Sequence, residues 1–149
     1  MHPLPHRYDV VARGGPTSLL SIEATNLPTL EATAPAQFGG PGNVWSPEDL
    51  LVASVASCFI LTFDTLAELS RLPWIEISCP TEAILEMADG KRKFTHFTLR
   101  PTLKLPRGAD PKKAEHLLHK AEERCLITAS LSSSVSLSAT IEFGDAPGS

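Results

Sequence analysis

The feature that most constrains the fold is a long apolar segment that follows a sharply marked helix start. Ser46 is a good N-cap residue, Pro47 suits the first helical position, and Asp49 stands where a capping-box carboxylate bonds back to the cap. From position 50 to 69 almost every residue is apolar or small. A helix with so little polar surface needs protein on most of its sides. We therefore expect a central helix with the rest of the fold arranged around it.

Strand patterns precede and follow this helix. Residues 8–12, 18–24 and 30–33 are predicted strands before it, and residues 74–79, 81–87, 94–105 and 135–143 are predicted strands after it. The glycine- and proline-rich loop 35–42 is expected to lack regular structure, and a second helix is expected from Asp110 to just before Cys125. This order predicts an α+β fold with a largely antiparallel sheet wrapped on the central helix.

The size of the chain bears on how that helix is covered. With 149 residues we expect one domain, 1–149, whose last residues, 144–149, form a frayed tail. Either a large sheet curls around the apolar helix or a second copy of the chain covers it, and for a chain of this size with only two helices the second copy is the expected cover. The sequence thus predicts an intertwined homodimer.

Charge and segment lengths exclude several classes of partner. The net charge is −4 and no run of Lys and Arg exceeds three residues, so nucleic acid is not an expected partner. The longest apolar run, residues 50–61, falls short of the roughly 20 residues of a membrane span, so no membrane is expected. The N-terminus lacks the pattern of a signal peptide, which predicts a cytoplasmic protein.

Three cysteines carry the candidate chemistry. Cys58, Cys79 and Cys125 are too few for a disulfide-stapled scaffold and show no zinc-ligand spacing. Any one of them alone is more often a buried small hydrophobe, and Cys79, in a predicted strand, is interpreted that way. Cys58, however, stands ten residues after Glu48 on the apolar helix, and Cys125 is available as its redox partner. A cysteine hydrolase is a weaker hypothesis that needs a base near Cys58, for which His96 is the candidate.

Four segments together resemble a known family. They are Phe38-Gly39-Gly40-Pro41, Ser46-Pro47-Glu48-Asp49-Leu50-Leu51, Ala53-Ser54-Val55-Ala56-Ser57-Cys58-Phe59 and Ala121-Glu122-Glu123-Arg124-Cys125-Leu126-Ile127. They resemble the OsmC/Ohr family of bacterial osmotically induced and organic hydroperoxide resistance proteins, which are thiol-dependent peroxidases. The resemblance implies a dimer with active sites at the subunit interface. It also implies catalysis without haem, flavin or metal cofactor, and recycling by an external dithiol or lipoylated reductant.

The resemblance also implies roles for individual residues. Cys58 matches the peroxidatic cysteine, Cys125 the resolving cysteine, and Glu48 the carboxylate that orients a catalytic arginine. Arg13, just before Gly14-Gly15, is the first candidate for that arginine, and Arg7 is the reserve candidate. An arginine beside the sulfur would favour the thiolate and hydrogen-bond the peroxide.

Two functions are therefore expected, in order of preference. The first is reduction of small-molecule hydroperoxides, organic ones before hydrogen peroxide, with apolar side chains such as Phe38, Phe59 and Ile60 as candidates to line the pocket. The alternative is a noncatalytic, stress-associated binding dimer that has kept the fold and lost the peroxidase activity.

Overall fold

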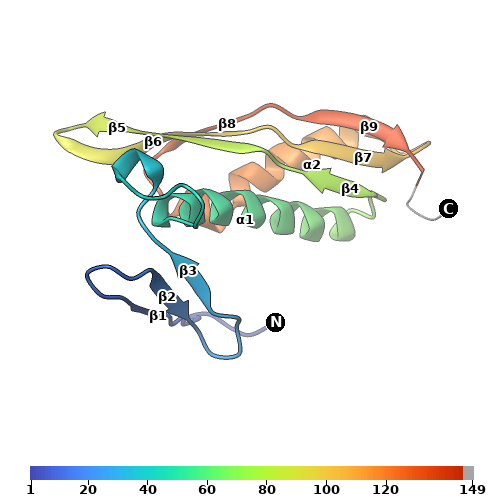
Figure 1. Cartoon of the computed structure of the whole chain (residues 1–149). Helices are drawn as coiled ribbons and strands as arrows, with labels where there is room; N and C mark the ends of the chain where they lie inside the picture. Colours follow the sequence, from blue (N-terminus) through green and yellow to red (C-terminus); the bar gives the residue numbers. More distant parts are fainter. Residues whose placement is uncertain (146–149) are drawn as a thin grey trace. The chain divides into compact units, whose positions relative to one another are not determined.

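Two compact units make up the chain in a computed structural model that describes residues 1–145. The first unit is Met1–Leu51 and the second is Val52–Ser149. Figure 1 shows the elements of both units, coloured along the chain.

The first unit carries a small antiparallel sheet. Strands β1 (Val11–Arg13), β2 (Leu20–Glu23) and β3 (Leu30–Ala32) pair in sequence order. The predicted N-terminal hairpin and the short third strand are confirmed, although each strand is shorter than its pattern suggested. The loop that follows contains one turn of 3-10 helix, η1 (Ala36–Phe38), where no regular structure was expected.

The central helix, α1 (Pro47–Leu69), has the predicted bounds and the predicted start. The fully buried Ser46 donates its hydroxyl to Asp49 Oδ2 at 2.7 Å, and the Asp49 N–H donates to Ser46 Oγ at 3.1 Å. The Ser46 N–H also donates to Asp49 Oδ2, at 3.1 Å. This reciprocal capping box satisfies N–H groups that have no partner within the helix.

The second unit contains two three-stranded sheets. One has the order β5 (Thr81–Ala88), β6 (Lys91–Leu99), β8 (Ser134–Leu137), and the other β4 (Glu76–Ser78), β7 (Thr102–Pro106), β9 (Thr140–Gly144). Strands β6 and β8 are parallel, as are β7 and β9, while β5–β6 and β4–β7 are antiparallel. Asp89 and Gly90 both have positive φ in the predicted turn between β5 and β6.

Three breaks interrupt the long strands of this unit: the one between residues 79 and 81 was predicted, and the other two correct the predictions of unbroken strands over residues 94–105 and 135–143. The breaks fall at Cys79-Pro80, Arg100-Pro101 and Ser138-Ala139. The two prolines cannot donate to a strand ladder, which explains the first two breaks. Backbone bonds such as Ser138 N–H to the Leu99 carbonyl, at 2.9 Å, carry the pairing across the interruption. The prediction that Cys79 is a strand residue is therefore wrong, since it lies in a break.

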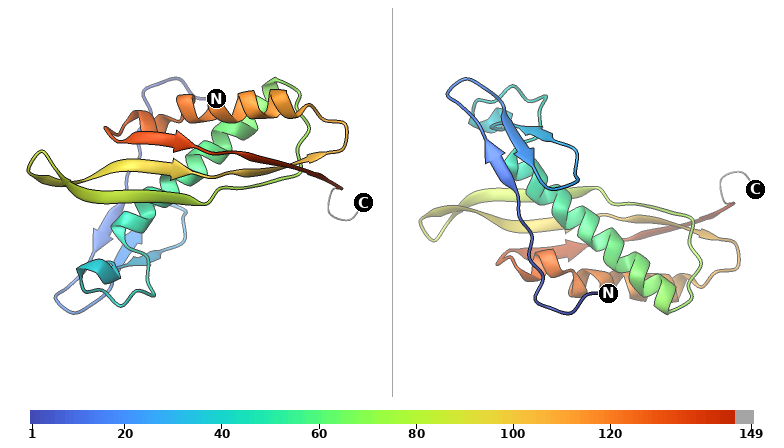
Figure 2. Two further views of the ribbon diagram at one scale, coloured as in Figure 1. Left: turned by 90° about the horizontal axis from the view of Figure 1, so that it is seen from above. Right: turned by 90° about the horizontal axis from the view of Figure 1, so that it is seen from below.

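Helices α1 and α2 (Pro111–Arg124) lie on the same side of these sheets, and a short helix, α3 (Leu126–Ala129), follows α2 (Figures 1 and 2). Asp110 caps α2 as predicted. The core of the second unit is formed by one face of each helix and by the central strands: Val55, Phe59, Phe63, Leu66, Ala67, Phe97, Leu99, Leu103, Leu105, Ala114, Leu117, Leu118 and Ala121. Trp74 packs edge-on against Phe63, with ring centroids 5.7 Å apart, as an anchor of the core.

One chain does not cover all of the apolar surface of α1. By length and composition the whole helix is long and apolar enough to cross a membrane, which corrects the estimate made from residues 50–61. Only 28% of its most apolar window is buried, and Leu61 is 66% exposed. Length and composition do not distinguish a membrane span from a helix enclosed by protein. The uncovered apolar surface is therefore expected to contact either a second protein surface or a membrane.

The C-terminal end of the described chain is still part of the second sheet. Gly144 is the last residue of β9, so this strand enters the predicted tail, and Asp145 lies 4.0 Å from Arg107. Residues 146–149 of the predicted frayed tail lie outside the described residues.

Candidate active site

Cys58 lies in the middle of α1 and is half-buried. Its carbonyl oxygen accepts a hydrogen bond from the Thr62 hydroxyl at 2.8 Å, one helical turn later. Its sulfur lies 4.0 Å from the same hydroxyl oxygen. The neighbouring Phe59 is fully buried in the core, so Cys58 stands at the border between the packed and the uncovered sides of the helix.

Cys125 occupies the junction of α2 and α3 and is buried. Its backbone is extended, with φ −63° and ψ 114°, so α2 ends there and α3 begins anew. The Cys125 carbonyl accepts bonds from the Ala129 N–H at 3.0 Å and from the Thr128 hydroxyl at 3.1 Å. Because a helix start leaves its first N–H groups without intrahelical partners, the backbone N–H groups of Leu126 and Ile127 can donate to an acceptor outside the helix.

The fold brings the two thiols within hydrogen-bonding reach of each other. The Cys125 thiol donates a hydrogen bond to the Cys58 sulfur, and the backbone N–H groups of Ile127 and Leu126 donate to that sulfur as well. Both cysteines belong to the second unit, so this contact lies within one compact body. Two sulfur atoms far apart in the sequence are thus placed where a disulfide between them needs only a local rearrangement.

This contact makes the two thiols unequal. Burial acts to raise the pKa of Cys58, but hydrogen bonds from Ile127, Cys125, Thr62 and Leu126 together outweigh it, and the pKa lies below its ordinary value. Burial raises the pKa of Cys125; bonds from Thr128 oppose the rise, and donation to Cys58 adds to it. Cys58 is therefore the thiol that ionises first, and Cys125 keeps its proton.

Glu48, Arg13 and Arg7 belong to the first unit. Glu48 lies in the first turn of α1, and among the described residues its buried Oε2 has no hydrogen-bond partner. Arg13 lies on β1 with its Nε 3.6 Å from Glu23 Oε2, both side chains being largely exposed. Arg7 is exposed in the segment before β1. Ten residues of helix separate Glu48 from Cys58, about 15 Å along the axis, so any link between them has to pass through another group.

The other candidate residues are engaged elsewhere. His96 bonds Ser134 Oγ through Nδ1 at 2.6 Å and Ser136 Oγ through Nε2 at 2.9 Å, on the surface of the β5–β6–β8 sheet. Both ring nitrogens bond serines of β8, and no contact between His96 and Cys58 is found among the described residues, so the structure gives no support for a cysteine hydrolase. The Cys79 sulfur lies 3.6 Å from the Thr81 hydroxyl, and burial raises the Cys79 pKa, as suits a structural thiol.

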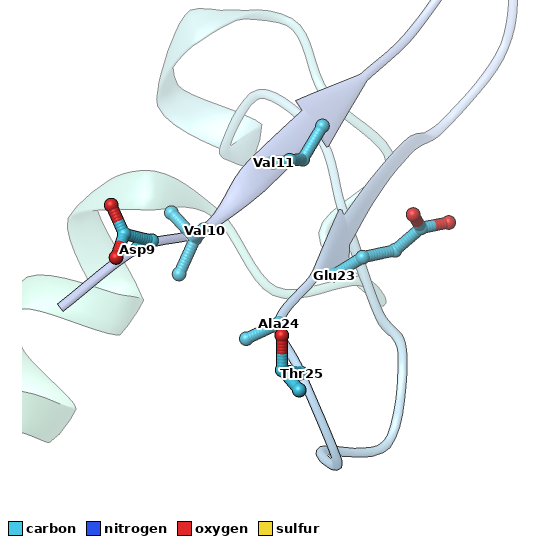
Figure 3. Close-up of a pocket in the computed structure, with 6 residues that line it drawn as sticks. All are labelled: Asp9, Val10, Val11, Glu23, Ala24 and Thr25. Atoms are coloured by element: carbon cyan, nitrogen blue, oxygen red, sulfur yellow. The ribbon is translucent and has the colours of Figure 1, made fainter.

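Two surface hollows lie in the first unit and contain no cysteine. One, of about 310 Å³, is lined by Asp9, Val10, Val11, Glu23, Ala24 and Thr25. Figure 3 shows that the Asp9 and Glu23 carboxylates there point away from each other. The other, of about 360 Å³, is lined by Gly42, Asn43, Val44, Trp45 and Asp49. Neither hollow gathers groups that could act together on a substrate.

Sequence reasoning missed two contributors to the thiol site. Thr62 follows Cys58 by one helical turn, a spacing that does signal a contact on a helix face. The donors from α3 left no signal, because they are backbone groups placed by tertiary packing. Leu126, whose N–H reaches the Cys58 sulfur, is 67% exposed, whereas Phe59 is too buried to meet a substrate.

Comparison with known proteins agrees with the family resemblance. The sequence model of a family described as OsmC-like protein matches residues 40–140, more than half of the chain. Among curated proteins, the uncharacterized protein YmaD of Bacillus subtilis is 29% identical over 120 residues, which cover 78% of this chain and 79% of YmaD.

Solved structures share the fold. An OsmC-like protein of unknown function from Vibrio cholerae superposes with a TM-score of 0.84 at 20% identity, covering 91% of this chain and 99% of that one. An organic hydroperoxide resistance protein OsmC from Legionella pneumophila has a TM-score of 0.70 at 24% identity, covering 93% and 99%. OhrB, the organic hydroperoxide resistance protein of Bacillus subtilis, has a TM-score of 0.58 at 24% identity, covering 91% and 96%.

Proposed function

We propose that this chain, which belongs to the OsmC-like protein family, is a thiol-dependent peroxidase that reduces organic hydroperoxides and, more weakly, hydrogen peroxide. The observation that carries the proposal is the contact between the Cys58 and Cys125 thiols, with the Cys58 pKa lowered. The names of the Legionella pneumophila and Bacillus subtilis structures point to the same substrate class.

The first step belongs to Cys58. Its thiolate attacks one oxygen of the hydroperoxide, the O–O bond breaks, and the departing alkoxide takes up a proton to leave as an alcohol. The sulfur is oxidised to sulfenic acid and the peroxide is reduced. Donors already aimed at the Cys58 sulfur favour the reactive ionised form before substrate arrives.

The second step belongs to Cys125. Its sulfur attacks the sulfenic sulfur of Cys58, water leaves, and a disulfide forms. Because the two thiols are in contact in the reduced protein, this step can outpace further oxidation of Cys58 to the irreversible sulfinic acid. An external dithiol, with a lipoylated protein as one candidate, then reduces the disulfide.

Glu48 and an arginine complete the proposed site. A buried carboxylate oxygen without a hydrogen-bond partner among the described residues suits a guanidinium, which binds carboxylates with two parallel hydrogen bonds. Arg13 is the first candidate and Arg7 the second. For Arg13, the exposed ion pair with Glu23 would have to open, at a cost of less than about 1 kcal/mol.

The site is proposed to work in a homodimer in the cytoplasm. A second copy would cover the uncovered surface of α1 and the exposed side chains of the first unit, such as Tyr8 and Val10. A reducing compartment keeps the three thiols free between turnovers. Leu126 lies near Cys58 in space and Leu61 lies on the same helix, and both side chains are exposed. These apolar side chains would favour hydroperoxides with apolar tails.

Thiol counting tests the chemistry directly. The reduced protein is treated with one equivalent of cumene hydroperoxide and its remaining thiols are titrated, with disulfides mapped by peptide mass spectrometry. The expected result is the loss of two thiols and a peptide linking Cys58 to Cys125. Cys58→Ser should abolish the loss, Cys125→Ser should leave a sulfenic acid at Cys58, and the matched control Cys79→Ser should still lose two thiols.

A noncatalytic binding dimer is the second candidate function. It is favoured by the position of Arg13, which precedes the glycine pair and is paired with Glu23. If all three thiols survive the peroxide treatment while the protein stays folded and dimeric, this second function replaces the first.

A further inference from the structure

We infer that Thr62 is a positioning residue for the Cys58 thiolate, which it stabilises with its side-chain hydroxyl. The inference rests on the proposed function for its biological meaning, but the effect on the thiolate can be measured without any peroxide. Thr62 is half-buried on α1, one turn after Cys58, and faces the same side of the helix.

The hydroxyl of Thr62 has two acceptors within reach. It donates to the Cys58 carbonyl at 2.8 Å, and its oxygen lies 4.0 Å from the Cys58 sulfur. That carbonyl also lies inside α1, where the backbone N–H one turn later bonds it. The bond from the hydroxyl is therefore a second bond to an oxygen that already has one.

This redundancy leaves the hydroxyl proton free to turn at small cost. A hydroxyl rotates about its C–O bond to suit its surroundings, and a charged acceptor forms a stronger bond than a neutral carbonyl does. When Cys58 loses its proton, the sulfur becomes that charged acceptor. The Thr62 proton can then leave the carbonyl, which keeps its helical bond, and point at the sulfur.

The other donors at this sulfur make Thr62 the side chain best suited to a test. Ile127 and Leu126 act through backbone N–H groups, which substitution does not remove, and Cys125 takes part in the proposed chemistry itself. Thr62 provides a donor that can be deleted without touching either cysteine. The chain also offers a matched control, since Thr65 makes the same type of bond, to the Leu61 carbonyl at 3.1 Å, on the exposed surface of α1.

The experiment measures the rate of alkylation of Cys58 by iodoacetamide as a function of pH, with each cysteine followed by peptide mass spectrometry. Thr62→Val, which keeps the shape and removes the hydroxyl, should move the midpoint of the Cys58 profile up by about 0.5 to 1 pH unit, as expected for one hydrogen bond. Thr62→Ser should restore the midpoint, and Thr65→Val should leave it unchanged. Thr62→Ala, with a better helix former, gives the same comparison if the valine variant folds poorly.

Peroxide reactivity gives a second readout. The rate constant for reaction of the thiol with cumene hydroperoxide at pH 7 should fall about three- to ten-fold in Thr62→Val and recover above the shifted midpoint. A merely structural role for Thr62 would lower the rate at every pH.

Each outcome decides a separate question. An unchanged midpoint in Thr62→Val and Thr62→Ala overturns the inference, as does an equal shift in Thr65→Val. If the midpoint moves as expected but the unmodified protein does not react with peroxide, the proposed function fails while the role of Thr62 in stabilising the thiolate holds.

Discussion

The direction of one hydrogen bond distinguishes the two contacting cysteines. Cys125 donates and Cys58 accepts, so the same bond favours the ionised form of Cys58 and the protonated form of Cys125. Both sulfurs were expected at the site from the sequence pattern around them. Their unequal acidity could not be expected, because it depends on the backbone donors of α3 and on burial, which only the tertiary structure sets.

Alkylation order follows from this difference. At pH 7 iodoacetamide should modify Cys58 before Cys79 and Cys125, since burial raises the pKa of both of the latter and hydrogen bonds lower that of Cys58. Peptide mass spectrometry at short reaction times measures the order. Faster modification of Cys125 than of Cys58 would reverse the proposed roles of the two thiols.

Glu122 offers a test of electrostatics away from the thiols. Burial raises its pKa, Glu123 adds to the rise and His119 opposes it. A carboxyl whose folded pKa is raised contributes stability below its unfolded pKa and loses it as the pH rises through the folded value. At pH 7 the ionised group is therefore unfavourable, and Glu122→Gln should increase the free energy of unfolding.

The size and pH range of that effect are limited. Because the side chain is partly solvated, the gain should stay below about 1 kcal/mol, and it should disappear below the unfolded pKa near ~4.3. Urea unfolding at both pH values, with Glu115→Gln at an exposed position of the same helix as control, measures it. The same gain at both pH values would show that charge is not the cause.

At the scale of elements, the sequence predicted the ends of helices better than the ends of strands. The cap residues Ser46 and Asp110 marked both long helices, because a cap acts on its own first turn. Alternation predicted where strands run but not where they stop. Pro80 and Pro101 gave a local signal for two of the breaks, whereas the break at Ser138-Ala139 follows from pairing with the neighbouring strand.

The capping box of α1 should carry a measurable share of stability. Ser46→Ala removes the two bonds that the Ser46 hydroxyl makes with Asp49, one in each direction, so a loss of about 1 to 2 kcal/mol is expected in chemical denaturation. Ser57→Ala is the matched control on the same helix, because its exposed hydroxyl bonds the Ala53 and Ser54 carbonyls, which lie within the helix, and alanine is a better helix former. An equal loss in both variants would contradict the capping argument.

At the scale of the whole molecule, the main feature is the apolar surface of α1 that one chain leaves uncovered. The apolar composition of this helix predicted that one chain would not enclose it, and the structure bears that out with a window only 28% buried. What covers it could not be derived from the sequence pattern alone, since an apolar surface does not specify its partner.

Sedimentation equilibrium distinguishes the possible covers. We expect a particle of twice the chain mass of 16.0 kDa in the absence of detergent. Leu61→Glu should weaken the assembly, because it places a charge on an apolar position that is 66% exposed in one chain. A monomer that binds lipid vesicles would instead identify the helix as a membrane-associated segment.

The proximity of Cys58 and Cys125 has a consequence for the thermal stability of the molecule. A covalent bond between these sulfurs would tie the middle of α1 to the junction of α2 and α3 and close a long stretch of chain, which restricts the unfolded ensemble by about 4 kcal/mol in the chain-entropy account. The oxidised protein would then melt at a higher temperature than the reduced one. In the proposed cycle, oxidation of the thiols would therefore raise the thermal stability and their reduction would lower it again.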